Sequence, residues 1–138
     1  MLKFVLTVAA YVVATLAVQA VSHFGINAAH YASVPFMRPE SIAALGILAS
    51  LIPGVVLAWL YPRVSLPGSA MMQAVTFAWL VGAILVSYIA LVEPAKYAVP
   101  SAAAWMAVEF GAGFVQFTIF GLLLGAIHMR IGAAHRMA

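Results

Sequence analysis

Four long apolar stretches, separated by short polar segments, constrain this chain more than any other feature of its sequence. They cover residues 4–24, 42–61, 71–92 and 102–128. A transmembrane helix needs roughly 20 apolar residues, because a rise of about 1.5 Å per residue must cross about 30 Å of hydrocarbon. Each stretch is continuously apolar, whereas a membrane β-strand alternates over about 10 residues. The sequence therefore predicts an all-α integral membrane protein, a bundle of four transmembrane helices forming one domain over residues 1–138.

The scarcity of charge excludes the water-soluble classes of protein. Only 7% of the residues are charged and 67% are hydrophobic, against about 25% and about 45–50% in soluble domains. Too few polar side chains exist to cover a globule of this size. A soluble enzyme, a nucleic-acid-binding protein and a disordered tail are therefore excluded. We expect the lipid bilayer as surroundings, with other membrane subunits or further copies of the chain as partners.

The distribution of basic residues predicts the orientation of the spans. An even number of spans places both termini on one side of the membrane. That side carries more basic residues, namely Lys3, Arg63, Arg130 and Arg136, than the other, which carries Arg38 and Lys96. Because Lys and Arg are enriched in cytoplasmic loops, we expect both termini in the cytoplasm.

Two segments of the chain resemble each other at an offset of about 65 residues, which is typical of an internal repeat. Residues 21–35 contain VSH and AHYASVP, and residues 86–100 contain VSY and AKYAVP. The pattern predicts a tandem repeat of two helical hairpins, with halves 1–65 and 66–138, related by a pseudo-two-fold axis along the membrane normal. The alternative is chance similarity in a chain rich in Ala and Val.

Glu109 is the sharpest single candidate for a functional residue, because it lies about two turns into the fourth span. An ionisable group at membrane depth costs roughly 2.5–3.5 kcal/mol and tends to face the bundle interior. Gln116 follows seven residues later on the same helical face. The pair is predicted to bind a ligand or to carry a proton. The alternative is that Glu109 bonds a neighbouring helix and fixes the packing.

A second group of polar residues is predicted at the outer ends of the spans. It comprises His23, His30, Tyr31, Glu40, Glu93, Lys96 and Tyr97. The residue types His23, His30, Glu40 and Glu93 are those that bind Zn²⁺ or another divalent metal. Their spacing matches no metal motif, however, and the alternative is that they are interfacial and loop side chains.

Three residues are predicted to act in helix packing. Gly121 and Gly125 form a pair of small residues one turn apart, which lets two helix backbones approach closely. Whether the partner helix belongs to this chain or to another subunit stays open. Pro53 lies in the middle of the second span, where it removes a backbone donor and is expected to bend the helix.

The sequences FMRPE at 36–40 and AKYAVPS at 95–101, followed by Trp105, resemble an uncharacterised family of small four-span bacterial inner-membrane proteins. The resemblance implies a bacterial inner-membrane protein and implies no activity. The chain departs from other small four-span families. It lacks the Cys pairs of vitamin-K-epoxide-reductase-like enzymes and the Glu-Arg pairing of glutathione-linked membrane enzymes. Its membrane Glu lies in the fourth span, whereas small multidrug exporters carry theirs in the first span.

Three functions follow from these features. The first is a non-catalytic accessory or assembly subunit that packs against a larger membrane complex. The second is a small transporter or ligand-binding module in which Glu109, Gln116 and the bend at Pro53 line the site. The third is a membrane enzyme with a metal at the outer face. The residues identify no cofactor.

Overall fold

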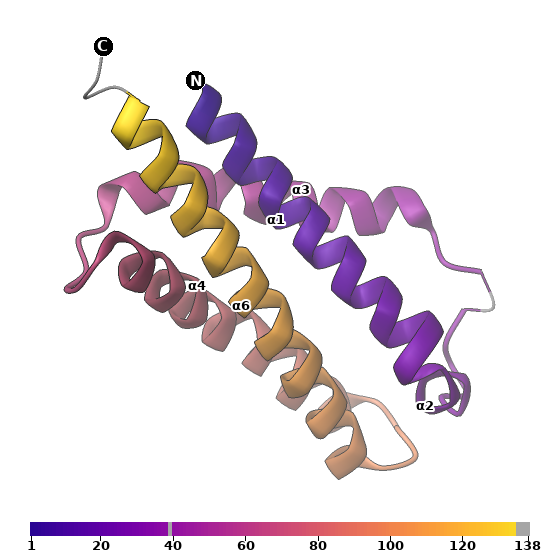
Figure 1. The fold of residues 1–138 in the computed structure, drawn as a ribbon. Coiled ribbons are helices and arrows are strands. Elements are labelled where there is room, and N and C mark those ends of the chain that lie inside the picture. The colour runs from indigo at the N-terminus through magenta and orange to yellow at the C-terminus, as the bar shows by residue number, and fades with distance from the viewer. Residues whose placement is uncertain (39, 135–138) are drawn as a thin grey trace.

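The four predicted spans form four long helices in the computed structural model, which describes residues 1–38 and 40–134. Every regular element within these ranges is helical (Figure 1). The segments long and apolar enough to cross a membrane are Leu2–Ile26, Ala43–Arg63, Ala70–Lys96 and Ala102–Arg130. They differ from the predicted stretches by a few residues at their ends. The prediction of an all-α fold with four helices long and apolar enough to span a membrane is therefore confirmed. His135 and Arg136 lie outside the described residues.

Each span contains one long helix, and shorter helical turns extend three of them. The long helices are α1 (Leu2–Val21), α3 (Ala43–Leu60), α4 (Ala70–Ser87) and α6 (Ala102–Ala134). The short elements are the π-helices η1 (Ser22–Ile26) and η3 (Tyr88–Val92), the 3-10 turn η2 (Tyr61–Arg63), and the helices α2 (Ala28–Ala32) and α5 (Glu93–Lys96). Serine side chains begin the helices of the second half. Ser69 Oγ accepts from the Met72 N–H at 3.3 Å, and Ser101 Oγ accepts from the Ala104 N–H at 3.2 Å, which satisfies one orphan donor of each helix.

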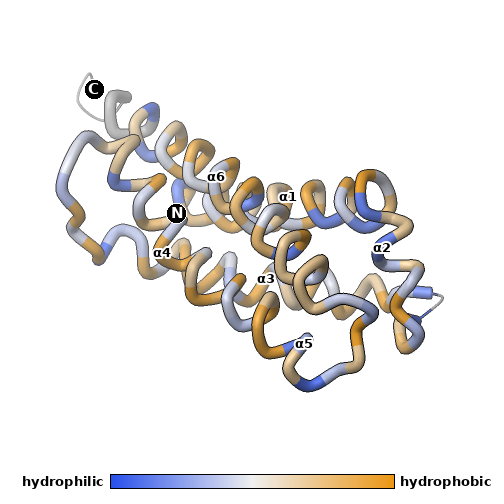
Figure 2. The backbone as a smooth tube through the Cα atoms, turned by 90° about the horizontal axis from the view of Figure 1, so that it is seen from below, coloured by the Kyte–Doolittle hydropathy of each residue, from blue (hydrophilic) through white to orange (hydrophobic). Residues whose placement is uncertain are grey.

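The long helices pack in the order α3, α1, α6, α4. Figure 1 shows α1 and α6 side by side, with α4 against α6 and α3 behind α1. Each sequence half is thus a helical hairpin, and the two hairpins meet along α1 and α6. The tube in Figure 2 is coloured as apolar along most of the long helices, with strongly hydrophilic residues near α2 and α5. α6 is the most enclosed span, with 44% of its most apolar window buried against 17–22% for the others.

Both hairpins contain the same order of elements. α1 continues into η1 and then into α2, and α4 continues into η3 and then into α5, before a non-helical segment leads to the second long helix. The two π-helices begin within one residue of corresponding positions in the two similar sequences, at Ser22 and at Tyr88. A π-turn inside a helix is rare and often marks a functional position. The order of elements agrees with the predicted repeat, which stays a prediction.

α4 and α6 approach each other closely along a row of small residues on α6. A Cβ atom added at Gly121 would lie 2.9 Å from Val75 Cα, and one added at Gly125 would lie 3.3 Å from Met71 Cα. Gly113 is covered by the Val86 side chain in the same way. The partner of the predicted small-residue pair is therefore α4 of the same chain.

The packed core lies toward the end of the bundle at which α1 begins. Tyr11 of α1 contacts Phe120 of α6 edge to face at 5.0 Å, and Phe77 of α4 contacts the Tyr61 ring at 5.1 Å. Leu57 brings α3 into the same buried cluster. All four spans converge there.

α3 leaves this core in its first half, because every residue of 43–49 is exposed. The helix continues without interruption through Pro53. Pro53 has no N–H to donate to the carbonyl of residue 49, as another residue at this position would. Ser50 Oγ does not replace this donor, because it donates to the Ile47 carbonyl at 2.8 Å. Gly54 follows and faces α1, where an added Cβ would lie 3.4 Å from the Val8 carbonyl oxygen.

Substitution of Gly121 by Ala tests the close approach of α4 and α6. The new methyl group would meet the α4 backbone, so we expect a loss of about 1–3 kcal/mol in the free energy of unfolding. Thermal unfolding in detergent measures the change. Gly111→Ala on the same helix is the matched control, because an added Cβ there meets nothing within 4 Å. Equal effects of the two substitutions would contradict the packing described.

Candidate functional site

Polar side chains line the face of α1 that meets α6. They recur at every fourth residue and comprise Thr7, Tyr11, Thr15 and Gln19, and His23 continues this spacing in η1. Residues four apart lie above one another on a helix. On α6, Gln116 bonds both Thr15 and Gln19, and toward the other end of the helix Thr7 Oγ1 and His128 Nε2 are 3.4 Å apart. The interface between the two hairpins is therefore bonded by polar groups.

Gln116 lies at the middle of this interface and is only 5% exposed. Its Oε1 accepts a hydrogen bond from Gln19 Nε2 at 3.1 Å, and its Nε2 donates to Thr15 Oγ1 at 3.0 Å. Both ends of the carboxamide are thus bonded to α1. This arrangement is that of a packing residue, since interhelical hydrogen bonds of this kind hold spans together in lipid.

Glu109 is bonded to another part of the same chain. It is 8% exposed, and its Oε1 accepts a hydrogen bond of 2.7 Å from the Tyr31 hydroxyl. Tyr31 belongs to α2, and the π-helix η1 lies between the end of α1 and α2. The bond ties α2, which lies in the connection between α1 and α3, to α6. This geometry is the packing alternative for Glu109, and its roles in proton transfer and ligand binding stay predictions.

The surroundings of Tyr31 keep its hydroxyl protonated. Burial raises the pKa of Tyr31 well above its usual range, and the hydrogen bond and negative charge of Glu109 raise this pKa further. A group with a raised pKa keeps its proton as the pH rises. Tyr31 therefore stays a hydrogen-bond donor to Glu109 at any pH near neutrality.

Part of the predicted outer group does come together around Tyr31. The His23 ring stacks on the Tyr31 ring at 3.7 Å with an interplanar angle of 11°, and His30 meets it edge to face at 5.3 Å. Trp105 of α6 closes the cluster, with its ring 6.1 Å from Tyr31. The charge of Glu93 also raises the pKa of Tyr31, so Glu93 lies within electrostatic reach of the same cluster.

The other predicted members do not join this cluster. Glu40, Lys96 and Tyr97 are exposed, and Tyr97 pairs with the Phe36 ring at 5.5 Å. Within residues 1–38 and 40–134, no group of three His, Asp or Glu side chains is close enough together to hold a metal ion. The four residues considered as metal ligands are therefore not assembled into one site.

Two buried nitrogen atoms of this aromatic cluster have no hydrogen-bond partner among the described residues. They are His30 Nε2 and Trp105 Nε1, whose rings are 5.8 Å apart. Trp105 is only 5% exposed. A buried polar atom is nearly always bonded in folded proteins, since leaving it unpaired is costly. The end of the bundle at which α1 ends and α6 begins therefore holds hydrogen-bonding capacity that the described chain does not use.

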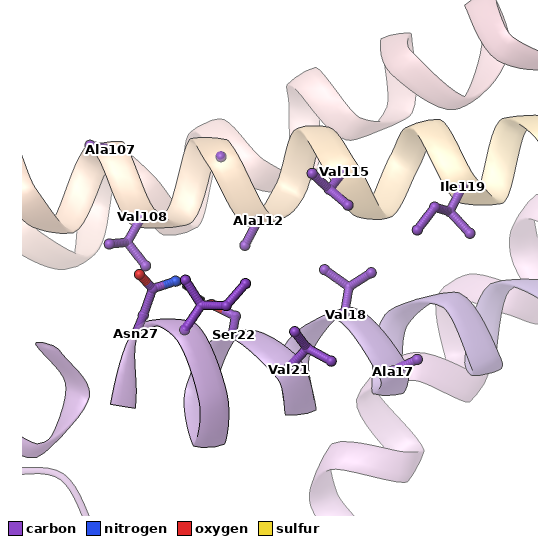
Figure 3. Close-up of a pocket in the computed structure, with 12 residues that line it drawn as sticks. Ala17, Val18, Val21, Ser22, Asn27, Ala107, Val108, Ala112, Val115 and Ile119 are labelled. Carbon is purple, nitrogen blue, oxygen red and sulfur yellow. Dashed lines mark hydrogen bonds between the residues drawn. The ribbon is translucent and has the colours of Figure 1, made fainter. Parts of the chain in front are cut away.

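A groove of about 670 Å³ opens between α1 and α6 beside this interface. The lining comprises Ala17, Val18, Val21, Ser22, Ile26 and Asn27 on one side and Ala107, Val108, Gly111, Ala112, Val115 and Ile119 on the other. Figure 3 shows Val18 and Val115 directed into the space between the two helices. The small residues at Ala17, Gly111 and Ala112 leave room along the walls. Its volume falls in the range of about 300–1,000 Å³ typical of small-molecule sites.

The groove is polar at one end only. Ser22 and Asn27 line it just beyond the C-terminal end of α1, where Asn27 Nδ2 donates to Ser22 Oγ at 3.0 Å. A carboxamide offers two donors and an acceptor oxygen, so this bond leaves most of its capacity for other partners. The Ser22 hydroxyl also lies beside Tyr31 and lowers its pKa slightly against the larger effects that raise it. The polar end of the groove is thus adjacent to the Tyr31–Glu109 pair.

Comparisons with protein-family models, with curated proteins and with solved structures found no match to this chain. The geometry therefore carries the functional argument.

Neither the groove nor the α1 side of the polar interface was predicted from the sequence. Gln116 was predicted, but not Thr15 and Gln19, to which Gln116 is bonded. A signal existed, since the polar residues of α1 recur every four positions from Thr7 to His23. No comparable signal marks the groove, whose walls are Ala, Val and Gly residues like those of the rest of the chain.

Substitution of Tyr31 by Phe tests the bond to Glu109. The change removes the hydroxyl donor and leaves a buried carboxyl oxygen without its partner, so we expect a loss of about 1–3 kcal/mol in the free energy of unfolding. Thermal unfolding in detergent is the measurement. Tyr97→Phe is the control, because Tyr97 is exposed and should tolerate the loss of its hydroxyl. A Tyr31→Phe protein as stable as this control would show that the bond contributes nothing.

Proposed function

We propose that this protein is a non-catalytic membrane module that binds an apolar, lipid-like molecule in the groove between α1 and α6. The observation that carries the proposal is the groove itself, with apolar walls along its length and Ser22 and Asn27 at one end. A ligand with a long apolar chain and a small uncharged polar head, such as a long-chain or isoprenoid alcohol, matches this distribution.

The chemistry of the walls favours a chain-shaped ligand over a charged one. Val18, Val115 and Ile119 offer only dispersion contacts to an occupant, and none of the described residues that line the groove is charged. Ligand sites are usually apolar with a few placed polar groups that fix orientation. The open side of the groove allows such a molecule to enter from the bilayer without first crossing water.

Glu109 and Gln116 serve this proposal indirectly. Neither lines the groove, and both are bonded to α1 or α2. Their bonds set the separation of α1 and α6 and hence the width of the groove. Pro53 lies on α3, which packs against α1, and does not line the groove either. The proposed site therefore differs from the ligand site expected around Glu109, Gln116 and Pro53.

Filling the groove should block the ligand. Gly111→Leu is suited to this test, since an added Cβ meets nothing within 4 Å and the longer side chain would enter the groove without displacing a neighbour. The probe is a long-chain fatty alcohol bearing a diazirine, crosslinked by light in phosphatidylcholine nanodiscs and mapped by peptide mass spectrometry. We expect labelling of residues 17–26 and 107–119 in the unaltered protein. In the Gly111→Leu variant we expect about tenfold less labelling of these residues, because a steric cost of about 1.4 kcal/mol lowers binding tenfold.

The control for this experiment is Gly46→Leu on α3. A Cβ atom at Gly46 also meets nothing within 4 Å, but Gly46 does not line the groove, so labelling should stay unchanged. Labelling spread evenly over the exposed residues of all four helices, or labelling that Gly111→Leu leaves intact, would contradict the proposal.

A second candidate function, an accessory subunit of a larger membrane complex, is favoured by the first half of α3. Residues 43–49 are exposed on every side of the helix, and this stretch includes Leu45, Ile47 and Leu48. A span that packs so little within its own chain has a free surface for the helix of another subunit.

Copurification in a mild detergent tests this second function. We expect a further polypeptide to remain bound to the natively expressed protein, and the substitution of Leu48 by Trp on the free face of α3 to release it by steric conflict. Gly111→Leu, which acts on the groove, serves as the control and should leave the complex intact. Recovery of this chain only as a monomer or as a self-associated oligomer would contradict the subunit function.

For the setting of the protein, we propose a bacterial inner membrane with both termini in the cytoplasm and a tandem repeat of two hairpins. Three described basic residues support this orientation, because they lie at the end of the bundle where α1 begins. They are Lys3, Arg63 and Arg130, and Lys and Arg are enriched in cytoplasmic loops. The bacterial inner membrane rests on the sequence resemblance alone. The repeat is supported by the shared order of long helix, π-turn, short helix and long helix in the two halves.

A further inference from the structure

A second pocket lies at the opposite end of the bundle from Glu109. It has a volume of about 380 Å³ and lies where α1 begins and where α3 and α6 end. Its lining includes Lys3, Arg63 and His128 together with the apolar side chains Phe4, Ala58, Trp59 and Pro62. Basic and apolar groups thus share one small cavity, which neither the groove nor the bonded α1–α6 interface explains.

No acidic side chain offsets the positive charge at this end. The sequence contains three Asp or Glu residues, and all of them lie toward the other end of the bundle. Glu40 lies between α2 and α3, Glu93 begins α5, and Glu109 is near the start of α6. Lys3 and Arg63 therefore attract an anion without competition from the carboxylate side chains of Glu40, Glu93 and Glu109.

Arg63 is held in place by Trp59. Its guanidinium lies over the Trp59 ring at 4.2 Å from the ring centroid, and Arg63 Nη1 donates to the Trp59 carbonyl oxygen. A guanidinium carries five N–H donors in a planar fork. One bond to a carbonyl leaves the other donors free for an anionic oxygen, and the stacking reduces the conformational freedom that binding would otherwise restrict.

The position of the pocket along the spans points to the polar boundary of the bilayer. Trp59 and Tyr61 are placed at the end of α3, and Trp and Tyr are enriched at the level of lipid headgroups. Apolar walls made by Phe4, Ala58 and Pro62 suit the glycerol and upper acyl part of a lipid. A free inorganic anion makes no use of these walls.

We propose that this pocket binds the phosphate group of an anionic phospholipid, with Lys3 and Arg63 as its ligands. Basic pockets between spans are a known mode of recognising anionic headgroups. Arg63 supplies the planar fork of donors for two phosphate oxygens, and Lys3 supplies a mobile ammonium. The bound lipid would anchor the end of α3 against α1 and α6, at the end of the bundle where all four spans converge.

Native mass spectrometry of the detergent-solubilised full chain tests the proposal. Titration with phosphatidylglycerol should give one tightly bound lipid, whereas phosphatidylcholine, which carries a phosphate but no net charge, should bind more weakly. The Lys3→Gln and Arg63→Gln double substitution should lower the affinity for phosphatidylglycerol by roughly 10- to 30-fold, the effect expected from two basic groups near a headgroup. Binding of phosphatidylcholine should not change.

Three controls separate the proposal from its alternatives. Arg38→Gln removes an exposed basic residue at the other end of the bundle and should leave phosphatidylglycerol binding intact. Lys3→Arg with Arg63→Lys keeps both charges and should retain most of the affinity, which shows that the double Gln variant lost charge rather than its fold. Inorganic phosphate at millimolar concentration should not displace the lipid.

Specific results would overturn the proposal. Equal binding of phosphatidylglycerol and phosphatidylcholine would show that charge is not recognised. Unchanged affinity in the double Gln variant would show that Lys3 and Arg63 are not the ligands. Displacement by inorganic phosphate would show that the pocket takes a free anion rather than a lipid. None of these results bears on ligand binding in the groove, which lies at the other end of α1.

Discussion

The arrangement of this protein depends on how α6 holds its two neighbours in an environment that gives apolar helices no hydrophobic reason to associate. α6 uses two different means on two faces. Toward α4 it presents Gly121 and Gly125, which let the two backbones come within contact, and Gly113, which the Val86 side chain covers. Toward the first hairpin it presents Glu109 and Gln116, which are buried and bonded. Close backbone contact and interhelical hydrogen bonds are the forces left when burial from water no longer differs between lipid and protein.

The groove follows from the polar bonds by which α6 contacts the first hairpin. Polar bonds from Gln116 to Thr15 and Gln19 fix the distance between α1 and α6, and small residues beside these bonds leave the space unfilled. A pair of helices held only by interdigitating apolar side chains would close such a space, because protein interiors pack to a high density. The polar interface thus explains both why Glu109 and Gln116 are in the membrane and why an apolar cavity persists next to them.

The two ends of the bundle carry different chemistry. At one end, His23 and Trp105 form an aromatic cluster around Tyr31, whose hydroxyl bonds the carboxyl group of Glu109. At the other end, Lys3 and Arg63 line a pocket that no carboxylate side chain shares. Such a separation of charge along the membrane normal fits a protein whose ends face different surfaces. It also allows two lipid-like ligands to be recognised by different means, one by its apolar chain and one by its phosphate group.

The sequence by itself determined the class of the protein, the number and approximate bounds of the spans, and the burial of Glu109, because long apolar stretches and rare charges have few solutions in a membrane. It also marked Gly121 and Gly125 as packing residues. Only the tertiary structure decided that their partner is α4, that Tyr31 bonds Glu109, and that Glu40, Lys96 and Tyr97 stay apart from the outer cluster. The groove and the basic pocket were likewise outside the reach of the sequence, since each is built from residues distant along the chain. Periodicity reports which face of one helix is special, whereas a cavity is a property of the space between helices.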